Sequence, residues 1–430
     1  MREMKDSGIE WIGTIPFDWK CCKQKYEIQL INGRAYSDSE FEEDGKYRIL
    51  RVGNLFSNPT WYTSSLELPP DKYCENGDLL YSWSMSYAPV IWSGEKVIYH
   101  YHIWKTKLSS NLNKKFAYYY LSALTDALKA KIHETTMGFI TMGVMNNSYI
   151  AFPCLKEQEK IVSFLDSQCS EIDAISADIQ KEIETLEQYK RSVITEAVTK
   201  GLNPDVEMKD SGIRWIGSIP KDWNVSRLKY VAKFFNGDRG KNYPSGEDLT
   251  DDGIAFLTSN NIHGLILDCS HEKSKFITEE RYNRLGGAKI QLNDIVFCLR
   301  GSVGNCAINK SLTKGTVASS LMTIRPIKAS PDFINYLLQT DICEVQTIKA
   351  MNGSCAANLS AENVSNYYFV EPPVTEQKKI AVFLDSKCSE IDTIMASKQH
   401  QLEILASYKK SLIYEYVTGK KEVPSWKQNT

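Results

Sequence analysis

An internal duplication constrains the fold of this chain more than any other feature of its sequence. Residues 4–19 (MKDSGIEWIGTIPFDW) and 208–223 (MKDSGIRWIGSIPKDW) agree at 13 of 16 positions, at an offset of 204. Residues 157–173 (EQEKIVSFLDSQCSEID) and 376–392 (EQKKIAVFLDSKCSEID) agree at 13 of 17 positions, at an offset of 219. The 430 residues therefore contain two copies of one unit, each with a Trp-rich opening, a middle region and a closing helix.

The two middle regions resemble each other only sparsely, and the second is longer by 15 residues, the difference between the two offsets. Similar frames around different sequences indicate one scaffold that presents two distinct surfaces. We therefore expect a first variable domain, a first spacer helix, a second variable domain, and a second spacer helix with a C-terminal tail. The predicted boundaries, in that order, are 1–153, 154–206, 207–372 and 373–430.

Each copy closes with a long amphipathic helix. Apolar side chains recur at steps of three and four from Ile161 to Ala197, and again from Ile380 to Ile413. A helix of about forty residues is roughly 60 Å long and cannot bury such a stripe alone. We therefore predict an α+β fold with two mixed α/β domains, separated by two long antiparallel helices that form a coiled coil with pseudo-twofold symmetry. The alternative is that each helix packs separately on its own domain.

Composition narrows the class of protein. An apolar content of 42% and a charged content of 24% are those of a globular protein. The sequence has neither an 18-residue apolar run nor a secretory signal, so we expect a cytoplasmic protein. Eleven cysteines without CxxC spacing predict reduced thiols, and six histidines, with His100 and His102 as the close pair, predict no metal site. A net charge of −2 neither supports nor excludes a nucleic-acid partner.

The KDSGIxWIGxIPxxW opening, the Pro-x-x-x-EQ-x-x-I-x-x-FLD helix start and the duplicated order resemble the specificity subunit of type I restriction–modification systems. The resemblance covers essentially the whole chain. It implies two target-recognition domains, each reading one half of a bipartite, asymmetric site in double-stranded DNA. It also implies that the helices set the spacer between the halves and dock two methyltransferase subunits, to which restriction subunits are added.

The sequence lacks the motifs of a catalytic subunit. It contains no D/N-P-P-Y/F methyltransferase tetrapeptide, no G-x-x-x-x-G-K-S/T loop and no convincing nucleophile–base set. We therefore expect a non-catalytic chain without a cofactor of its own, and S-adenosylmethionine, ATP and Mg would belong to the partner subunits. Two other classes stay open: a stand-alone DNA-binding regulator, and a coiled-coil adaptor with two protein-binding domains. A repressor would normally show a recognition helix with clustered basic residues, which the sequence lacks.

Base edges in the major groove are read by arginine, by amides and by small hydroxyl or methyl groups. In the second domain Arg300 is the strongest candidate, because it follows the apolar strand predicted at 295–297. A solvated hairpin or turn capping is the alternative for the remaining positions. The other candidates in this domain are Arg239, Lys241, Asn242, Ser259, Asn260, Asn261, Ser302, Asn305, Asn352 and Ser354.

In the first domain, segment 81–87 corresponds to the Arg300 segment but carries aromatic and hydroxyl groups instead of a basic fork. The two domains should therefore read different half-sites. Lys25 and Lys229 belong to the repeated frame and more plausibly contact phosphate or solvent than bases. The candidates for DNA contact in this domain are Arg34, Tyr36, Arg51, Asn54, Ser82, Trp83, Ser84, Thr136, Met137 and Thr141.

Overall fold

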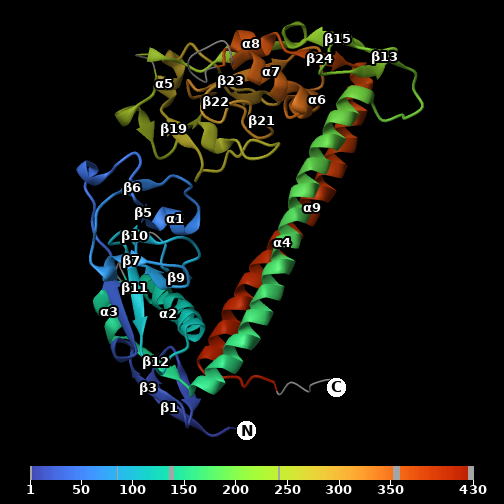
Figure 1. The fold of residues 1–430 in the computed structure, drawn as a ribbon. Helices are drawn as coiled ribbons and strands as arrows, with labels where there is room; N and C mark the ends of the chain where they lie inside the picture. The colour runs from blue at the N-terminus through green and yellow to red at the C-terminus, as the bar shows by residue number, and fades with distance from the viewer. Residues whose placement is uncertain (1, 85, 135–139, 241–242, 352–358, 425–430) are drawn as a thin grey trace. The chain divides into compact units, whose positions relative to one another are not determined.

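The computed structural model describes the chain apart from residues 1, 85, 135–139, 241–242, 352–358 and 425–430 (Figure 1). It consists of two compact units. The first unit contains residues 1–179 and 400–430, and the second contains residues 180–399. The division passes through both long helices, so each unit holds one of the variable domains together with one half of each helix.

The first unit is built from short sheets and one large helix. In its main antiparallel sheet the strand order is β4 (Ile28–Asn32), β11 (Ile103–Leu108), β8 (Leu79–Ser82) and β9 (Ala88–Ile91). In the second sheet the order is β6 (Tyr62–Ser64), β5 (Tyr47–Leu50), β10 (Val97–Tyr99) and β7 (Tyr73–Cys74), with β10 parallel to β5. Two-stranded pairs join β1 (Met4–Ile9) to β2 (Gly13–Pro16) and β3 (Lys20–Lys23) to β12 (Tyr149–Phe152). The helices are α1 (Val52–Phe56), α2 (Lys114–Glu134) and α3 (Met142–Asn147).

The second unit repeats the order of the main sheet and three strands of the other sheet, whereas the fourth strand of that sheet lies at its opposite edge. Its main sheet has the order β16 (Ala232–Asn236), β23 (Leu321–Pro326), β20 (Ile295–Cys298) and β21 (Cys306–Ile308). The other four-stranded sheet has the order β17 (Leu249–Thr250), β19 (Lys275–Ile277), β18 (Ile254–Leu257) and β22 (Gly315–Val317), with β18 parallel to β22. The pairs are β13 (Met208–Asp210) with β14 (Ser218–Pro220), and β15 (Asn224–Arg227) with β24 (Tyr368–Glu371). The helices are α5 (Glu279–Arg284), α6 (Pro331–Leu338), α7 (Asp341–Met351) and α8 (Ala361–Ser365).

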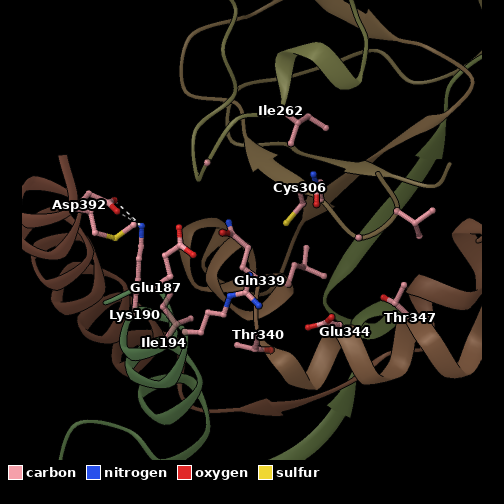
Figure 2. A pocket seen from close by; sticks show the side chains of 17 residues that line it. Glu187, Lys190, Ile194, Ile262, Cys306, Gln339, Thr340, Glu344, Thr347 and Asp392 are labelled. Carbon is pink, nitrogen blue, oxygen red and sulfur yellow. Dashed lines mark hydrogen bonds and ion pairs between the residues drawn. The ribbon is translucent and has the colours of Figure 1, made fainter. Parts of the chain in front are cut away.

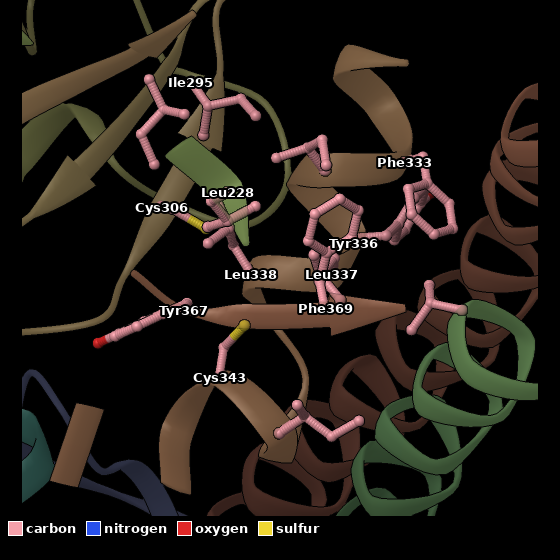
Figure 3. Close-up of a cluster of buried hydrophobic side chains, with 14 of the residues drawn as sticks. Leu228, Ile295, Cys306, Phe333, Tyr336, Leu337, Leu338, Cys343, Tyr367 and Phe369 are labelled. Atoms are coloured by element: carbon pink, nitrogen blue, oxygen red, sulfur yellow. The ribbon is translucent and has the colours of Figure 1, made fainter. Parts of the chain in front are cut away.

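A continuous hydrophobic core joins each variable domain to the long helices. In the second unit α6 contributes Phe333 and Leu337, which are fully buried with Leu228 and Phe369 (Figure 3). The end of the long helix α4 (Leu155–Lys200) belongs to the same cluster through Val198. Burial of side chains of this size supplies the main stabilisation of such a domain, about 1.5–3 kcal/mol for each. The helix is therefore part of the domain core in this unit.

The two long helices, α4 (Leu155–Lys200) and α9 (Val374–Val417), run antiparallel and pack together (green and red in Figure 1). In the first unit Lys409 Nζ lies 2.6 Å and 2.7 Å from the carboxylate oxygens of Asp173. In the second unit Lys190 Nζ lies 2.7 Å from both oxygens of Asp392. The predicted coiled coil is confirmed, and the alternative of separately packed helices is wrong.

These ion pairs are half exposed and add little stability, but they define the register of the helix pair. Lys409 follows Lys190 by 219 residues, and Asp392 follows Asp173 by the same number. One contact is thus made twice, once in each unit. The pairing obeys the pseudo-twofold symmetry that the sequence repeat predicts.

The residues of the repeated EQ signature fasten each helix to its domain. Trp19 Nε1 donates a hydrogen bond to Glu157 at 3.3 Å, and Trp223 Nε1 donates one to Glu376 at 3.0 Å. The next residue, Gln158, is fully buried, accepts a bond from the Asn113 amide and donates to the carbonyls of Asn111 and Pro153. These bonds hold the start of α2 next to the start of α4.

In the second copy the corresponding glutamine makes similar hydrogen bonds. The buried Gln377 accepts a bond from the Ser330 amide at 2.8 Å and donates to the Pro372 carbonyl at 2.9 Å. The aspartate of the repeated FLD sequence is also used in both copies, because Tyr119 donates to Asp166 at 2.8 Å and Tyr336 to Asp385 at 2.7 Å. The residues that both copies of the repeat share are therefore those that join each domain to its helix.

The described residues include no helix with the length and apolar content that a bilayer crossing requires. Within the same part of the chain, no cluster of three or more His, Cys, Asp or Glu side chains is arranged to hold a metal ion.

Candidate nucleic-acid interface

Three loops of the second unit meet where strands of its sheets end. Gly237 N donates to Leu321 O at 3.1 Å, Leu299 N donates to Ser320 O at 2.8 Å, and Ala318 N donates to Leu257 O at 2.8 Å. Segment 318–321 therefore holds together the loops that follow β16, β18 and β20. These are the loops that carry Arg239, the Ser259 turn and Arg300.

The first unit makes the same set of backbone bonds. Gly33 N donates to Ile103 O at 3.1 Å, Trp83 N to His102 O at 3.1 Å, and His100 N to Leu50 O at 2.9 Å. Segment 100–103 thus has the role of segment 318–321, and the loops that it gathers carry Arg34, Arg51 and Trp83. The two units build one loop frame from different residues.

Arg300 lies on an exposed turn whose backbone is fixed. The preceding residue, Leu299, is fully buried, whereas Arg300 is exposed and has no hydrogen-bond or ion-pair partner among the described residues. Gly301 takes φ +75°, a left-handed conformation that favours glycine at this turn. Ser302 and Asn305 are exposed on the same loop, where Asn305 N donates to Ser302 O at 3.2 Å. The turn thus presents three predicted side chains to solvent.

Arg239 is also exposed, on a loop that its neighbour holds in place. The carboxylate of Asp238 accepts bonds from the amides of Gly286 at 3.3 Å and Gly287 at 2.7 Å. A cleft of about 440 Å³ lies beside this loop and is lined by Arg239 and both glycines. The neighbouring candidates Lys241 and Asn242 lie outside the described residues, as do Asn352 and Ser354 of the later loop.

The three residues of the Ser259 turn have different environments. Asn261 is fully buried, accepts a bond from Thr258 N at 2.8 Å, and donates to Asp268 O at 2.9 Å and Ser274 Oγ at 3.1 Å. Its side chain caps the turn, which is the alternative considered for this position. Ser259 and Asn260 are exposed and remain available for contact.

In the first unit Arg34 and Tyr36 form a local group. The Arg34 guanidinium lies 5.2 Å from the Tyr36 ring centre and forms an ion pair with Glu40. The hydrogen bond from Arg34 lowers the pKa of Glu40 to about 2, so this carboxylate stays charged and holds the arginine. The Tyr36 hydroxyl is buried without a partner among the described residues, and burial raises the pKa of Tyr36.

Arg51 and Asn54 lie at α1. The Arg51 guanidinium is 4.0 Å from the Tyr62 ring centre, and its Nε is buried without a hydrogen-bond partner among the described residues. Asn54 accepts a bond from Arg51 N at 3.2 Å and donates to the carbonyls of Asn58 and Thr60. The amide of Asn54 therefore stabilises the loop in this structure, while Arg51 keeps an unused donor.

Aromatic rings connect the remaining loops of the first unit. Trp83 stacks on Trp104 at 5.6 Å between ring centres, contacts His102 edge-on at 5.2 Å, and donates Nε1 to Tyr101 O at 2.8 Å. His100 lies 4.8 Å from His102, and burial lowers the pKa of His100 to about 4, so the ring is neutral at pH 7. The unit therefore presents a largely aromatic surface where the second unit presents Arg300.

The other candidates of the first domain are separate from this surface or undescribed. Ser82 is buried, and its Oγ donates to Ser84 O at 3.3 Å. Thr141 caps α3 by accepting a bond from Val144 N at 3.3 Å. Thr136 and Met137 lie outside the described residues. The sequence did not reveal segments 100–103 and 318–321 as parts of the loop frame, although the Tyr-His alternation at 99–102 was a visible signal in the first.

A cleft of about 550 Å³ in the second unit lies beside the Arg300 loop and is lined by α4, α7 and α9 (Figure 2). Its wall carries charges of both signs, among them Glu187, Glu344 and the Lys190–Asp392 pair. It also contains the Cys306 thiol, whose pKa is raised by burial, so that the thiol is protonated and a poor nucleophile. The described residues of this cleft contain no pairing of a nucleophile with a base.

The fold and the loop frame define a class of two-domain proteins in which a helix pair carries two related domains. A sequence profile described as the type I restriction modification DNA specificity domain matches residues 16–185 and again residues 220–403. The chain therefore belongs to the family of type I restriction–modification specificity subunits.

The similarity to known proteins extends over almost the whole chain. The EcoBI specificity subunit of Escherichia coli is 21% identical over 434 residues, which cover 97% of this chain and 89% of that protein. The MjaVIII specificity subunit of Methanocaldococcus jannaschii is 25% identical over 417 residues, covering 94% and 93%. A chain solved in work on complex assembly and conformational transition of the type I R-M system has a TM-score of 0.68 at 13% identity, covering 95% of this chain and 99% of that chain. At this identity the likeness to the solved chain concerns the fold.

Proposed function

We propose that this chain reads a bipartite, asymmetric site in double-stranded DNA, with one half-site bound by each variable domain. The observation that carries this proposal is the shared loop frame. The same backbone bonds hold residues 100–103 in one unit and 318–321 in the other, while the side chains at the loop tips differ. A common frame gives both domains the same approach to DNA, and different side chains give each domain its own base preference.

We assign base reading to the exposed candidates of the second unit, which are Arg239, Ser259, Asn260, Arg300, Ser302 and Asn305. In the first unit we assign it to Arg34, Arg51 and Trp83, which are half-buried and supply guanidinium groups and an aromatic ring. Arginine pairs with guanine through a bidentate contact, whereas an aromatic surface with hydroxyl groups favours apolar contact with thymine methyl groups. The two half-sites should therefore have different base compositions.

The long helices are proposed to set the spacer between the half-sites and to dock two methyltransferase subunits. Large apolar side chains remain exposed on the helix pair, and they recur with the repeat. Ile175 is 43% exposed and Ile394 46%, while Tyr189 is 56% exposed and Tyr408 53%. Each pair is related by 219 residues, so each unit offers the same side chains to a partner. Two identical partner subunits fit such a duplicated surface.

The chemistry is assigned to the partners. We propose that this chain binds no cofactor and catalyses no step, and that S-adenosylmethionine, ATP and Mg are used by the methyltransferase and restriction subunits. The assembly would act on DNA in the cytoplasm. The absence of methyltransferase and phosphate-binding motifs from the sequence supports this division of labour.

A domain exchange tests the proposal. Residues 1–153 are replaced by the corresponding domain of another specificity subunit of known target, and the chain is co-expressed with its methyltransferase subunits. Methylation mapping of the host genome should show one half of the motif changed and the other half and the spacer retained. A control exchange of residues 207–372 should change the opposite half. A methylation pattern that does not respond to either exchange, in an assembled complex, would contradict the proposal.

A further inference from the structure

A polar patch with two basic residues, two tyrosines and one asparagine occurs in both units, outside the loop frame. In the first unit it comprises Lys23 on β3, Lys25 and Tyr26 on the short 3-10 turn Gln24–Tyr26, Asn147 at the end of α3, and Tyr149 on β12. Lys23 and Tyr149 are paired across the two strands. We call these five residues the basic–tyrosine patch of the first unit.

The second unit contains the corresponding patch. Its members are Arg227, Lys229, Tyr230, Asn366 and Tyr368, and Arg227 is paired with Tyr368 across β15 and β24. The first three follow their counterparts by 204 residues and the last two by 219, the two offsets of the repeat. Four of the five positions keep their residue and the fifth, Lys23, is replaced by another basic residue, Arg227, whereas the loop tips of the two units differ. A surface shared in this way cannot distinguish two half-sites.

The asparagine of each patch has a fixed orientation. Asn147 Nδ2 donates to Gly143 O and Asn366 Nδ2 donates to Glu362 O, both at 2.9 Å within their own helices. The amide oxygen is thereby turned toward the cations. Asn147 Oδ1 accepts from Lys23 Nζ at 3.4 Å.

In the second unit one amide oxygen gathers two cations. Asn366 Oδ1 accepts from Arg227 Nη1 at 3.0 Å and from Lys229 Nζ at 2.9 Å. Because both nitrogens donate to the same oxygen, Arg227 Nη1 and Lys229 Nζ lie close to each other. Arg227 also donates to the Tyr368 hydroxyl, and its guanidinium lies 4.5 Å from the Tyr368 ring centre. A neutral oxygen thus holds two positive charges in place without neutralising them.

The cations of the patch have no carboxylate partner in the part of the chain that the structure describes. Among the described residues, Lys23, Lys25, Arg227 and Lys229 form no ion pair. The acidic residue adjacent to Tyr26, Glu27, is turned toward Ser109 and Asn111. In the second unit the positive charges of Arg227 and Lys229 are held close together and repel each other, and a bound anion would relieve that repulsion.

The tyrosines make the patch accessible and suited to one kind of anion. Tyr26 is 68% exposed and Tyr230 61%, and Lys25 and Lys229 lie 5.3 Å and 5.4 Å from the centres of these rings. Lysine, arginine, asparagine and tyrosine are the side chains that bind phosphate oxygens in DNA complexes, where they position the protein without reading sequence.

We propose that the basic–tyrosine patch of each unit binds backbone phosphates of the DNA duplex beside the half-site that the unit reads. The inference rests on the proposed function. Strand β4 or β16, five residues long and so about 17 Å, separates the patch from the Arg34 or Arg239 loop. At about 3.4 Å per base pair, this length corresponds to at most about five base pairs between those phosphates and the bases contacted by that loop.

Salt dependence of binding tests the proposal. The full chain, assembled with its methyltransferase subunits, is titrated with a labelled duplex carrying the mapped target and with a scrambled duplex, at several KCl concentrations. For K25Q/K229Q we expect the slope of log K against log salt to fall by about two, close to 0.9 for each lost phosphate contact. Affinity for both duplexes should fall by the same factor. The methylated motif should stay the same, and K25R/K229R should restore the slope.

The control is K46Q/K221Q, which removes one exposed lysine from each unit, both already paired with glutamate. The control should leave the slope unchanged. An unchanged slope in K25Q/K229Q would overturn the proposal, and so would loss of the assembled complex in size-exclusion chromatography, which would make the patch a protein contact. If the wild-type complex fails to prefer its target over the scrambled duplex, the proposed function itself fails. If the complex still prefers its target duplex but K25Q/K229Q leaves the salt slope unchanged, only the proposal about the basic–tyrosine patch is refuted.

Discussion

At the scale of single residues, Arg300 combines a fixed backbone with a side chain that is exposed and has no partner among the residues that the structure describes. Leu299 is bonded on both sides, donating to Ser320 O at 2.8 Å and accepting from Leu359 N at 3.1 Å. The guanidinium that follows can therefore be directed at one base without ordering a mobile loop. We expect Arg300→Ala to relax specificity at one base pair of the second half-site, at a cost of about 1–3 kcal/mol. Competition binding between the target and single-base variants measures this effect.

Arg284→Ala is the matched control for Arg300→Ala. Arg284 is exposed in the same unit, but it pairs with Glu280 on α5. Its removal should leave base preference unchanged. If Arg300→Ala retains full discrimination at every position of the half-site, Arg300 does not read a base.

Residue environments of this kind could be predicted only in part. Asn260 and Asn261 are adjacent and chemically identical, yet the first is exposed and the second is buried with three hydrogen bonds. The difference depends on Asp268 and Ser274, whose positions are fixed by the tertiary fold and not by local sequence. Candidates chosen by residue type on a turn therefore include both solvent-facing and structural amides.

At the scale of elements, the buried glutamine of the EQ signature is the joint between helix and domain. Gln158→Ala removes the three hydrogen bonds of a fully buried amide, with Asn113 N, Asn111 O and Pro153 O. The Pro153 carbonyl is then left unpaired in a buried site at a cost of about 1–3 kcal/mol, so we expect clear destabilisation of the first unit. Thermal unfolding of the full chain checks the prediction.

Gln180→Ala on the same helix provides the comparison, because Gln180 is exposed. It should change stability by less than about 0.5 kcal/mol. Equal stability losses in the two variants would show that the joint does not depend on the buried amide.

Elements differed in how far the sequence predicted them. The long helices were predictable because their apolar period continues over about six heptads, and the observed helices, Leu155–Lys200 and Val374–Val417, contain both predicted apolar stripes. The sheets were less accessible. Strands such as β7 and β17 have two residues, and β5 pairs in parallel with β10 from nearly fifty residues away. Such pairing leaves no periodic signal in the sequence.

At the scale of the whole molecule, both units contain part of one antiparallel helix pair. The same Lys–Asp ion pair occurs once on each side of the midpoint of this helix pair. The midpoint of Asp173 and Lys190 on α4 falls between residues 181 and 182. The midpoint of Asp392 and Lys409 on α9 falls between residues 400 and 401. An insertion at both points preserves both ion pairs and all contacts between helix and domain within each unit. The helix pair can therefore be lengthened without altering either reading surface.

We expect a seven-residue insertion at both points, copied from 175–181 and 394–400, to lengthen the DNA spacer while both half-site sequences stay the same. One heptad adds about 10 Å of helix, which corresponds to at most about three base pairs. The heptad keeps the apolar seam continuous, whereas the same insertion in α4 alone would move Lys190 out of register with Asp392 and should destabilise the pair. Methylation mapping with the assembled enzyme reports the spacer directly. A double insertion that alters half-site bases but not the spacer would show that the helices do not act as the ruler, because their length would then have no bearing on the distance between the two contacts.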